Sequence, residues 1–330
     1  MATFRSYAEQ SRHYFNRPHT GVPAGRIDSP AAWLGRDMRD AQQQWSNQLT
    51  PQDIEELEQA IAAIESAGIA TAEVTKANFE LPYLGPKIRH WRQNLADGLG
   101  FVVVRGLPVN DWGEQKSALA YWGIGHHLGL PGGQNPQGEV LGHVKDYGEE
   151  ENSPNVRRYR TAGNIDFHCD AADVVGLLCL QPAKNGGQSR IASSVAIFNE
   201  AQRRIPDTIH RLFEPFALDL RDEQPEGKRG FTRIQPCCWN GKAPLRTFYH
   251  SEYFRSAARL DDVQIDPAAK QILDTYDELG LDENFHLDMW LEQGDMQFVS
   301  NHTTLHARTA YEDSADPDRR RHLLRLWLSL

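Results

Sequence analysis

The sequence predicts a mainly β protein with added helices: a sandwich, barrel or jelly roll behind a helical N-terminal layer. Three observations support this fold class. Segments with helical periodicity crowd the N-terminal third. From about residue 139, short β-prone runs alternate with Gly, Pro and Asn. Two helical segments interrupt these runs, and we interpret them as insertions between strands. There is no internal repeat and no low-complexity linker, so one domain is the simplest organisation.

The helical layer begins with a well-marked helix. Thr50 is a suitable N-cap, Pro51 fits the first helical position, and Gly68 supplies the stop. Between them, isoleucine and leucine recur on one face and predict a buried stripe. The next expected elements are a helix over 86–98, a buried strand within 100–109 and a helix over 114–127.

The strands of the second part follow in short succession. The expected strand segments are 139–146, 167–183, 186–194, 246–254, 296–309 and 321–330. The expected helical insertions are 194–213 and 266–280. The stretch 239–257 contains aromatic and polar residues that suit either a pocket wall or ordinary packing, and packing is the more common use.

Composition excludes several classes of protein. No apolar run approaches the roughly 18 residues of a membrane span. The first 20 residues lack the apolar core of a signal peptide, so we expect a cytoplasmic protein. The net charge of −10 argues against nucleic acid as a partner, although the basic runs 157–160 and 319–322 suit an anionic small molecule. The four cysteines match neither a disulfide framework nor a zinc motif, and we expect reduced thiols.

His168 and Asp170 are two positions apart in "FHCD", at the head of a β-prone run. On a strand, residues i and i+2 face the same side about 6.5 to 7 Å apart, so both can bind one ion while Cys169 faces away. Imidazole with carboxylate suits Fe(II), Mn or catalytic Zn. The pair is a weak signal, because "FHLD" repeats it at His286 and Asp288.

A jelly roll completes such a site with a third ligand from a distant strand. His306 lies far along the chain from His168 but close to His286, so His168 is the better partner and His286 is expected to be structural. His302, four residues before His306, would face the same way on a regular strand. Spacing alone does not choose between these two histidines.

The C-terminal segment 321–330 reads as a strand with two different faces. Leucines occupy one face, and Arg321 and Arg325 share the other. Two arginines on an inner face are expensive to bury without an anionic partner, so they predict a carboxylate clamp. The alternative is an exposed edge strand whose arginines are solvated.

Together these segments resemble the TauD/TfdA family of Fe(II)/2-oxoglutarate-dependent dioxygenases. The resemblance rests on His168-x-Asp170, "NGGQS" at 185–189, "GDMQFVSNHTTLHART" at 294–309 and "RRRHLLRLWL" at 319–328. These motifs stand in the family's order and cover the chain from about residue 100 to the end. The resemblance implies a double-stranded β-helix (jelly roll, cupin-like), with residues 1–85 as a helical extension packed on the core and 86–330 as the dioxygenase domain.

The resemblance also assigns the metal ligands. Fe(II) would be held by His168, Asp170 and His306, and Ala307 replaces the glycine that usually follows the distal histidine. In halogenating relatives a small residue replaces the aspartate, so the presence of Asp170 favours oxygenation over halogenation.

Four further residues match cosubstrate positions of the family. Arg321 matches the arginine that pairs with the distal carboxylate of 2-oxoglutarate, and Ser189 matches a supporting hydroxyl. Arg325 corresponds to a second arginine near cosubstrate or substrate. Asn164, four positions before His168, matches an asparagine found at the site of some members.

The family chemistry uses Fe(II), 2-oxoglutarate and O2, and couples decarboxylation to succinate and CO2 with oxidation of an unactivated C–H bond. Hydroxylation of a small anionic or zwitterionic substrate such as an amino acid is the expected reaction. Desaturation or oxidative cyclisation uses the same cofactors. The competing classes are a cupin-like metal hydrolase, which has no use for Arg321, and a jelly-roll binding protein without turnover. These features exclude neither a monomer nor a homo-oligomer.

Overall fold

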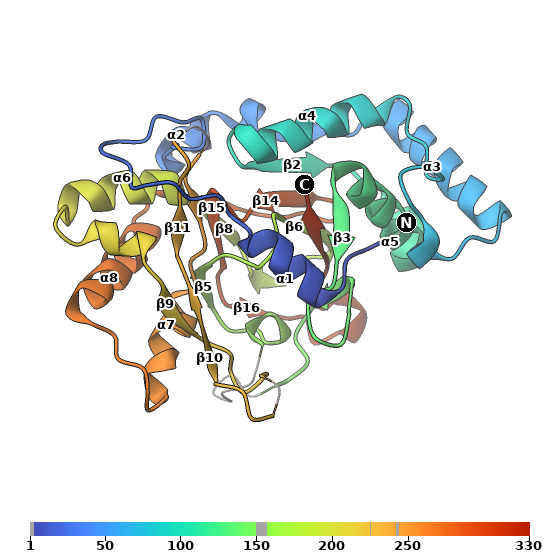
Figure 1. Ribbon diagram of the computed structural model, residues 1–330. Helices are drawn as coiled ribbons and strands as arrows, with labels where there is room; N and C mark the ends of the chain where they lie inside the picture. Colours follow the sequence, from blue (N-terminus) through green and yellow to red (C-terminus); the bar gives the residue numbers. More distant parts are fainter. Residues whose placement is uncertain (1–2, 150–156, 225, 242–243) are drawn as a thin grey trace.

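The computed structural model describes residues 3–149, 157–224, 226–241 and 244–330. Two β-sheets face each other with helices on their outer sides (Figure 1). The larger sheet has the order β1 (Ser46–Gln48), β2 (Phe101–Arg105), β14 (Met296–Ser300), β6 (Val174–Gln181), β17 (His322–Ser329) and β3 (Leu130–Gly132), and β4 (Leu141–Val144) also pairs with β17. The smaller sheet has the order β13 (His286–Met289), β8 (Ser189–Ser193), β15 (Thr304–Arg308) and β5 (Ile165–His168). This arrangement confirms the predicted jelly roll.

The remaining elements connect or cover these sheets. The helices are α1 (Tyr7–Phe15), α2 (Gly35–Asp40), α3 (Pro51–Ser66), α4 (Leu84–Asp97), α5 (Val109–Leu128), α6 (Ser194–Arg204), α7 (Ser251–Ser256) and α8 (Pro267–Leu281). Three short antiparallel pairs join β9 (Phe216–Asp219) with β10 (Phe231–Ile234), β11 (Cys237–Cys238) with β12 (Arg246–Thr247), and, over a long sequence separation, β7 (Asn185–Gly186) with β16 (Tyr311–Glu312). In the described part of the chain, no helix has the length and apolar character to cross a membrane.

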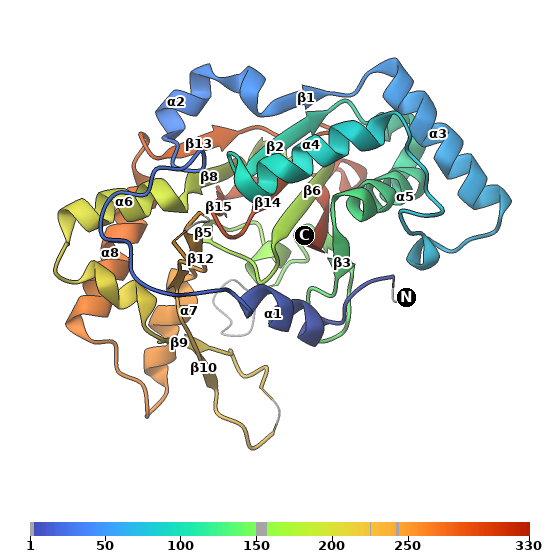
Figure 2. The same ribbon diagram turned by 45° about the horizontal axis from the view of Figure 1, so that its top comes forward.

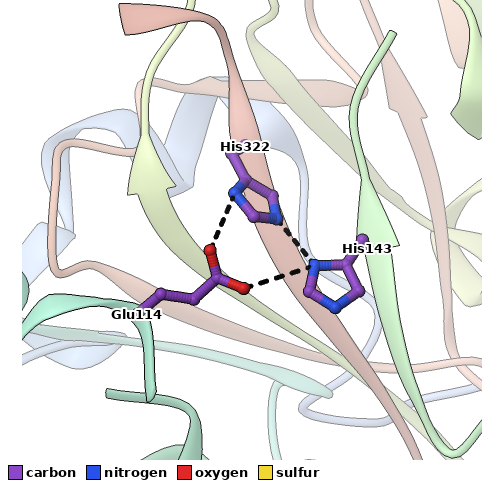
Figure 3. Close-up of side chains that lie close together, drawn as sticks. All are labelled: Glu114, His143 and His322. Carbon is purple, nitrogen blue, oxygen red and sulfur yellow. Dashed lines mark hydrogen bonds and ion pairs between the residues drawn. The ribbon is translucent and has the colours of Figure 1, made fainter. Parts of the chain in front are cut away.

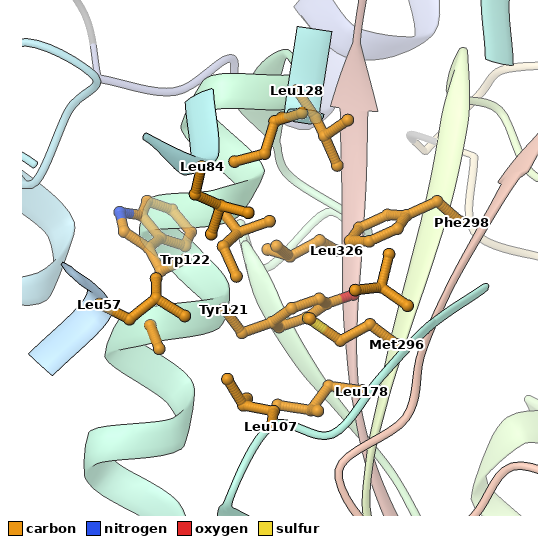
Figure 4. Close-up of a cluster of buried hydrophobic side chains, with 14 of the residues drawn as sticks. Leu57, Leu84, Leu107, Tyr121, Trp122, Leu128, Leu178, Met296, Phe298 and Leu326 are labelled. Carbon is orange, nitrogen blue, oxygen red and sulfur yellow. The ribbon is translucent and has the colours of Figure 1, made fainter. Parts of the chain in front are cut away.

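Helices α3, α4 and α5 cover the outer face of the larger sheet (Figure 2). Their apolar sides meet leucines of β6 and β17, as expected for a helix stripe packed on a sheet. Trp122 of α5, Leu57 of α3 and Leu326 of β17 are at the centre of this cluster and are almost fully buried (Figure 4). The burial anchors β17, the strand that carries both predicted arginines.

The other two apolar clusters fix the smaller sheet. Helices α6 and α8 pack on each other, and α6 also packs on β8 and β15. Between the sheets, Phe101, Ile191 and Trp327 belong to a third cluster. Because side chains fill one end of the space between the sheets, the remaining space becomes a cavity.

Several predicted elements are confirmed at residue level. Helix α3 begins at Pro51 with Thr50 as N-cap, whose hydroxyl accepts from the backbone of Asp53 while the Asp53 carboxylate accepts from Thr50. Strand β17 is flanked by β6 on one side and by β3 and β4 on the other. Its arginines are therefore not on an exposed edge strand, and that alternative is wrong.

Three predicted strand segments were wrong, and one strand was missed. The segment 167–183 is two strands, β5 and β6, and the segment 296–309 is two strands, β14 and β15, which belong to different sheets. The segment 246–254 is a two-residue strand followed by helix α7: among the described residues its ladder partner, β11, is itself two residues long, and His250 adds only an isolated bridge to His168. The N-terminal layer also contributes β1, which pairs in parallel with β2 at the sheet edge. Its three residues, Ser, Asn and Gln, are polar and carry no strand pattern.

Candidate active site

Three potential metal ligands meet between β5 and β15. These strands are antiparallel neighbours, and their register places His306 directly opposite His168. The two ring centroids are 4.2 Å apart. Asp170 follows just beyond the end of β5, with its carboxylate oxygens 4.0 Å from Nε2 of His168 and 3.6 Å from Nε2 of His306. One ligand atom from each residue lies within 4.8 Å of the others. Two imidazoles and one carboxylate on one side of an ion form the facial donor set of non-haem iron sites.

Neighbouring groups orient these donors. Nδ1 of His168 donates to the carbonyl oxygen of Asp166 at 2.8 Å, which leaves Nε2 available for a metal. The Trp327 indole donates to Asp170 Oδ2 at 3.0 Å, and the backbone N–H of Asp170 donates to the side chain of Asn301 at 2.9 Å. The larger sheet therefore holds the carboxylate of Asp170, and the turn before β15 holds its backbone.

The protonation states also suit a divalent cation. Burial, together with the adjacent His168, lowers the pKa of His306 to about 3. Burial raises the pKa of Asp170, but the charges of Arg325 and the two histidines outweigh it, and the pKa lies below its ordinary value. A neutral imidazole and an ionised carboxylate are the ligand forms that bind metal.

Cys169 is separate from this donor group. Its side chain is buried in the cluster behind the smaller sheet. Burial raises the pKa of its thiol to about 12, so the thiolate that would bind metal is not formed near neutral pH.

The repeated motif has a structural environment. Nδ1 of His286 donates to the carbonyl oxygen of Gly280 at 3.1 Å. Arg190 binds both oxygens of Asp288, at 2.7 and 3.0 Å. Because its carboxylate is already paired, Asp288 is a poor metal ligand.

His302, the rival of His306, points elsewhere. Its Nε2 is 2.7 Å from a carboxylate oxygen of Asp173, and its ring stacks on Tyr14 with centroids 4.7 Å apart. Strand β15 begins at Thr304, so His302 lies in the preceding turn and the regular alternation that would align it with His306 does not apply.

Arg321 and Ser189 face the cavity that contains the three donors. The Arg321 side chain is 5% exposed, and its guanidinium lies over the ring of Tyr311 with 5.0 Å to the centroid. Its Nη1 has no hydrogen-bond partner among the described residues. Burial lowers its pKa from the ordinary value. A buried guanidinium without a carboxylate partner is expected to receive an anionic ligand.

The "NGGQS" segment makes room for this arginine. Gly187 has φ +74°, and a Cβ there would lie 3.2 Å from Nε of Arg321. A larger residue would therefore combine backbone strain with crowding at the guanidinium. Two residues later, Ser189 donates to the side-chain oxygen of Gln297 at 2.7 Å inside the same cavity.

Arg325 lies nearer the metal ligands. Its Nε donates to Gln134 at 2.6 Å, and its guanidinium lies over the Tyr159 ring, 4.3 Å from the centroid. Asn164 is placed differently: its side chain is exposed, donates to Asp166 at 2.7 Å, and does not line the cavity. The structure thus brings Arg325 to the three potential ligands and leaves Asn164 outside.

The cavity has a volume of about 570 Å³. Its wall includes Arg157, Arg158 and Arg221, each near an acidic or phenolic group. Arg157 bonds Glu223 at 2.7 Å, Arg158 bonds Glu252 at 3.3 Å, and Arg221 bonds the Tyr253 hydroxyl at 3.0 Å. The sequence flagged the basic run 157–160, but nothing in it signalled Arg221 or its acidic neighbours.

Two further contributions escaped the sequence analysis. Helix α1 brings Tyr7, Ser11 and Phe15 to the cavity, although the first 85 residues carried no recognisable motif. Arg221 and Asp222 have φ of 55° and 62°, a conformation that non-glycine residues rarely adopt and that occurs often at functional sites. Of the stretch 239–257, residues 248, 250, 252 and 253 line the cavity.

Comparisons with known proteins assign the chain to a family. Residues 53–327 match the profile of the taurine catabolism dioxygenase TauD, TfdA family. The chain is 31% identical over 308 residues to FR-33289 synthase of Streptomyces rubellomurinus, covering 92% of this chain and 90% of the relative. It is 29% identical over 328 residues to taurine hydroxylase-like protein SAT17 of Stachybotrys chartarum, covering 97% and 82%.

Solved structures share the fold. An asparagine oxygenase in complex with Fe(II), 3-hydroxyasparagine and succinate superposes with a TM-score of 0.67 at 16% identity, covering 86% of this chain and 93% of that one. The non-haem iron oxygenase OrfP with Fe and α-ketoglutaric acid gives 0.63 at 15% identity, covering 86% and 94%. The chain belongs to the TauD/TfdA family and is an Fe(II)- and 2-oxoglutarate-dependent dioxygenase. This selects the dioxygenase over the hydrolase and the binding protein.

Proposed function

We propose that in this TauD/TfdA dioxygenase His168, Asp170 and His306 hold Fe(II), and that Arg321 and Ser189 bind the distal carboxylate of 2-oxoglutarate. One observation carries the proposal: the three donors and a buried arginine without an anionic partner share one cavity. When bound, the iron and 2-oxoglutarate supply the chemistry that uses O2 to oxidise an unactivated C–H bond, releasing succinate and CO2.

The chain's own residues position the reactants. The Asp166 carbonyl keeps Nε2 of His168 free, and the Trp327 indole fixes one oxygen of Asp170. Arg325, held by Gln134, places a positive charge beside the ligand carboxylate and favours its ionised form. The apolar walls exclude water from the cavity, which strengthens these charged contacts.

Anaerobic titration tests the site assignment. Metal-free protein given Fe(II) and 2-oxoglutarate is expected to develop the visible charge-transfer band of the chelate. Asp170→Ala should weaken the band because it removes an iron ligand. Wild-type protein that binds iron without ever forming the band would refute the assignment.

For the substrate, we propose a small zwitterion of the amino-acid class. The cavity wall alternates positive and negative groups, and the Arg158–Glu252 pair is joined by one long bond at 3.3 Å. The carboxylate of a bound substrate would pair with Arg158 and its ammonium group with Glu252, so both charges of the cavity wall stay paired. The solved structures of the same fold include complexes with 3-hydroxyasparagine and with L-Arg, which supports this class.

Substrate-dependent succinate release tests this class. We expect release with free amino acids and much less with their N-acetylated or decarboxylated analogues, which carry only one of the two charges. Arg158→Gln should raise KM for the substrate while leaving the 2-oxoglutarate band intact. Arg203→Gln, which removes an exposed arginine of α6, is the matched control. Equal release with N-acetylated analogues would overturn the zwitterion assignment.

We further propose that residues 1–85 act as an extension of the single dioxygenase domain and not as an independent unit. Strand β1 pairs with β2 of the larger sheet, and helix α1 lines the cavity. Removing this extension should therefore impair both stability and substrate binding, measured by thermal unfolding and by KM.

A further inference from the structure

A second group of metal-ligating side chains lies outside the cavity. Glu114 comes from α5, His143 from β4 and His322 from β17 (Figure 3). Nδ1 of His143 is 2.8 Å from Nε2 of His322. The Glu114 carboxylate lies 4.0 Å from His143 Nδ1 and 3.8 Å from His322 Nδ1. One atom from each residue falls within 4.8 Å of the others, as at the iron site.

The fold, and not one flexible segment, brings these residues together. In the β17–β4 pairing, His143 is opposite Leu324, which shares a face of β17 with His322. That face is the one covered by α5, whereas Arg321 faces the cavity on the other side. Glu114 directly follows Gly113, where α5 is kinked with φ 68°. The kink positions the glutamate above the two histidines.

The donors suit a borderline transition metal. Two imidazole nitrogens and one carboxylate are a common ligand set for Zn²⁺, which also takes a water as its fourth ligand. Ligand atoms of a tetrahedral zinc are about 3.3 Å apart for bonds of about 2.05 Å. Nδ1 of His143 and Nε2 of His322 are 2.8 Å apart, so they need to separate by only about 0.5 Å.

The environment permits an ion to enter. Glu114 is 54% exposed at its side chain, and His143 is about one third exposed, so the rotation that widens the group meets little packing resistance. Among the described residues, the printed contacts of these ring nitrogens are the bond between the two histidines and the ion pairs to Glu114, all of them within the proposed ligand group (Figure 3). We propose that Glu114, His143 and His322 form a surface Zn²⁺ site, separate from the iron site, that ties α5 to β4 and β17.

The test uses full-length protein whose iron site is filled first. Protein loaded anaerobically with Fe(II) and 2-oxoglutarate is titrated with Zn²⁺ by calorimetry, while the visible band reports that the iron remains in place. We expect one further equivalent of zinc to bind and the unfolding temperature to rise, because the metal binds only the folded arrangement.

Three variants locate the binding. Glu114 is exposed and His143 is about one third exposed, so His143→Gln and Glu114→Gln should both fold. Each should weaken zinc binding by about 100-fold or more, since even an outer partner of a metal ligand contributes about 10- to 100-fold. His90→Gln, at an exposed histidine of α4, is the matched control and should bind as the wild type does.

Two results would overturn the proposal. One is uptake of no further equivalent by the wild type with its iron site filled. The other is unchanged affinity and unchanged thermal shift in His143→Gln, which would place the zinc elsewhere. Both results are independent of the iron-site assignment, because the band is followed in the same samples.

Discussion

Replacing Arg321 by alanine should separate ligand binding from stability. In the ligand-free protein its guanidinium is buried over Tyr311 and has no carboxylate partner among the described residues. With 2-oxoglutarate bound, the same group would make two charge-assisted hydrogen bonds, each contributing about 1.5–3 kcal/mol. Their sum, about 3–6 kcal/mol, corresponds to a roughly 100- to 10,000-fold weaker Kd at about 1.4 kcal/mol per tenfold.

The free energy of unfolding should change much less in Arg321→Ala than it does when a buried ion pair is broken. Removing one partner of a buried pair costs about 3–5 kcal/mol because it strands the other charge. Arg321→Ala leaves no opposite charge unpaired. The unfolding free energy of the ligand-free variant should therefore change by no more than about 1 kcal/mol, the scale of the lost contact between the guanidinium and the Tyr311 ring.

The assays are titration of the visible band with 2-oxoglutarate under anaerobic conditions and thermal unfolding of the ligand-free protein. Arg190→Gln is the matched control, since it removes an arginine of β8 that pairs with Asp288 outside the cavity. The reasoning fails if Arg321→Ala weakens the Kd less than about tenfold, or if Arg190→Gln weakens it as much.

Four further variants test the surroundings of the site. His306→Gln should abolish iron binding in equilibrium dialysis, whereas His302→Gln should retain it; iron lost only from His302→Gln would reverse the assignment. Histidine hydrogen bonds outweigh burial and depress the pKa of Asp173, so its stabilising effect is complete above the unfolded value of about 3.9 and disappears as pH falls towards the folded value. Asp173→Asn should therefore lose about 2 kcal/mol at pH 7 in denaturant unfolding and show a shallower loss of stability in acid; an unchanged acid profile would contradict this. Gly187→Ala should cost about 1–3 kcal/mol from its positive φ and weaken 2-oxoglutarate binding by crowding Arg321; a wild-type Kd would show that the guanidinium is not displaced.

The sequence predicted an element correctly where contacts between neighbouring residues determine it, and less well where pairing with another strand determines it. Helix α3 begins at its predicted N-cap because Thr50, Pro51 and Asp53 make contacts within one turn. The segment 246–254 was mispredicted as one strand because its ladder partner, β11, pairs with only its first two residues and helix α7 follows. Strand β1 had no apolar alternation to reveal it, since it lies at a sheet edge with polar side chains.

The residue patterns by themselves determined a mainly β class with a helical layer, the donor types and the two-faced pattern of the segment 321–330, because residue chemistry and strand alternation are local properties. The family resemblance added the jelly roll and the expectation of His306. Only the tertiary structure showed that His306 lies opposite His168, since that depends on the β5–β15 register. It also decided that Arg321, just before β17, and Arg325 within it are buried, because neighbouring strands flank β17 on both sides. The cavity wall at Arg158 and Glu252, and the second cluster at His143, combine segments that are distant in sequence. Their proximity results from packing of the whole chain, which no single segment encodes.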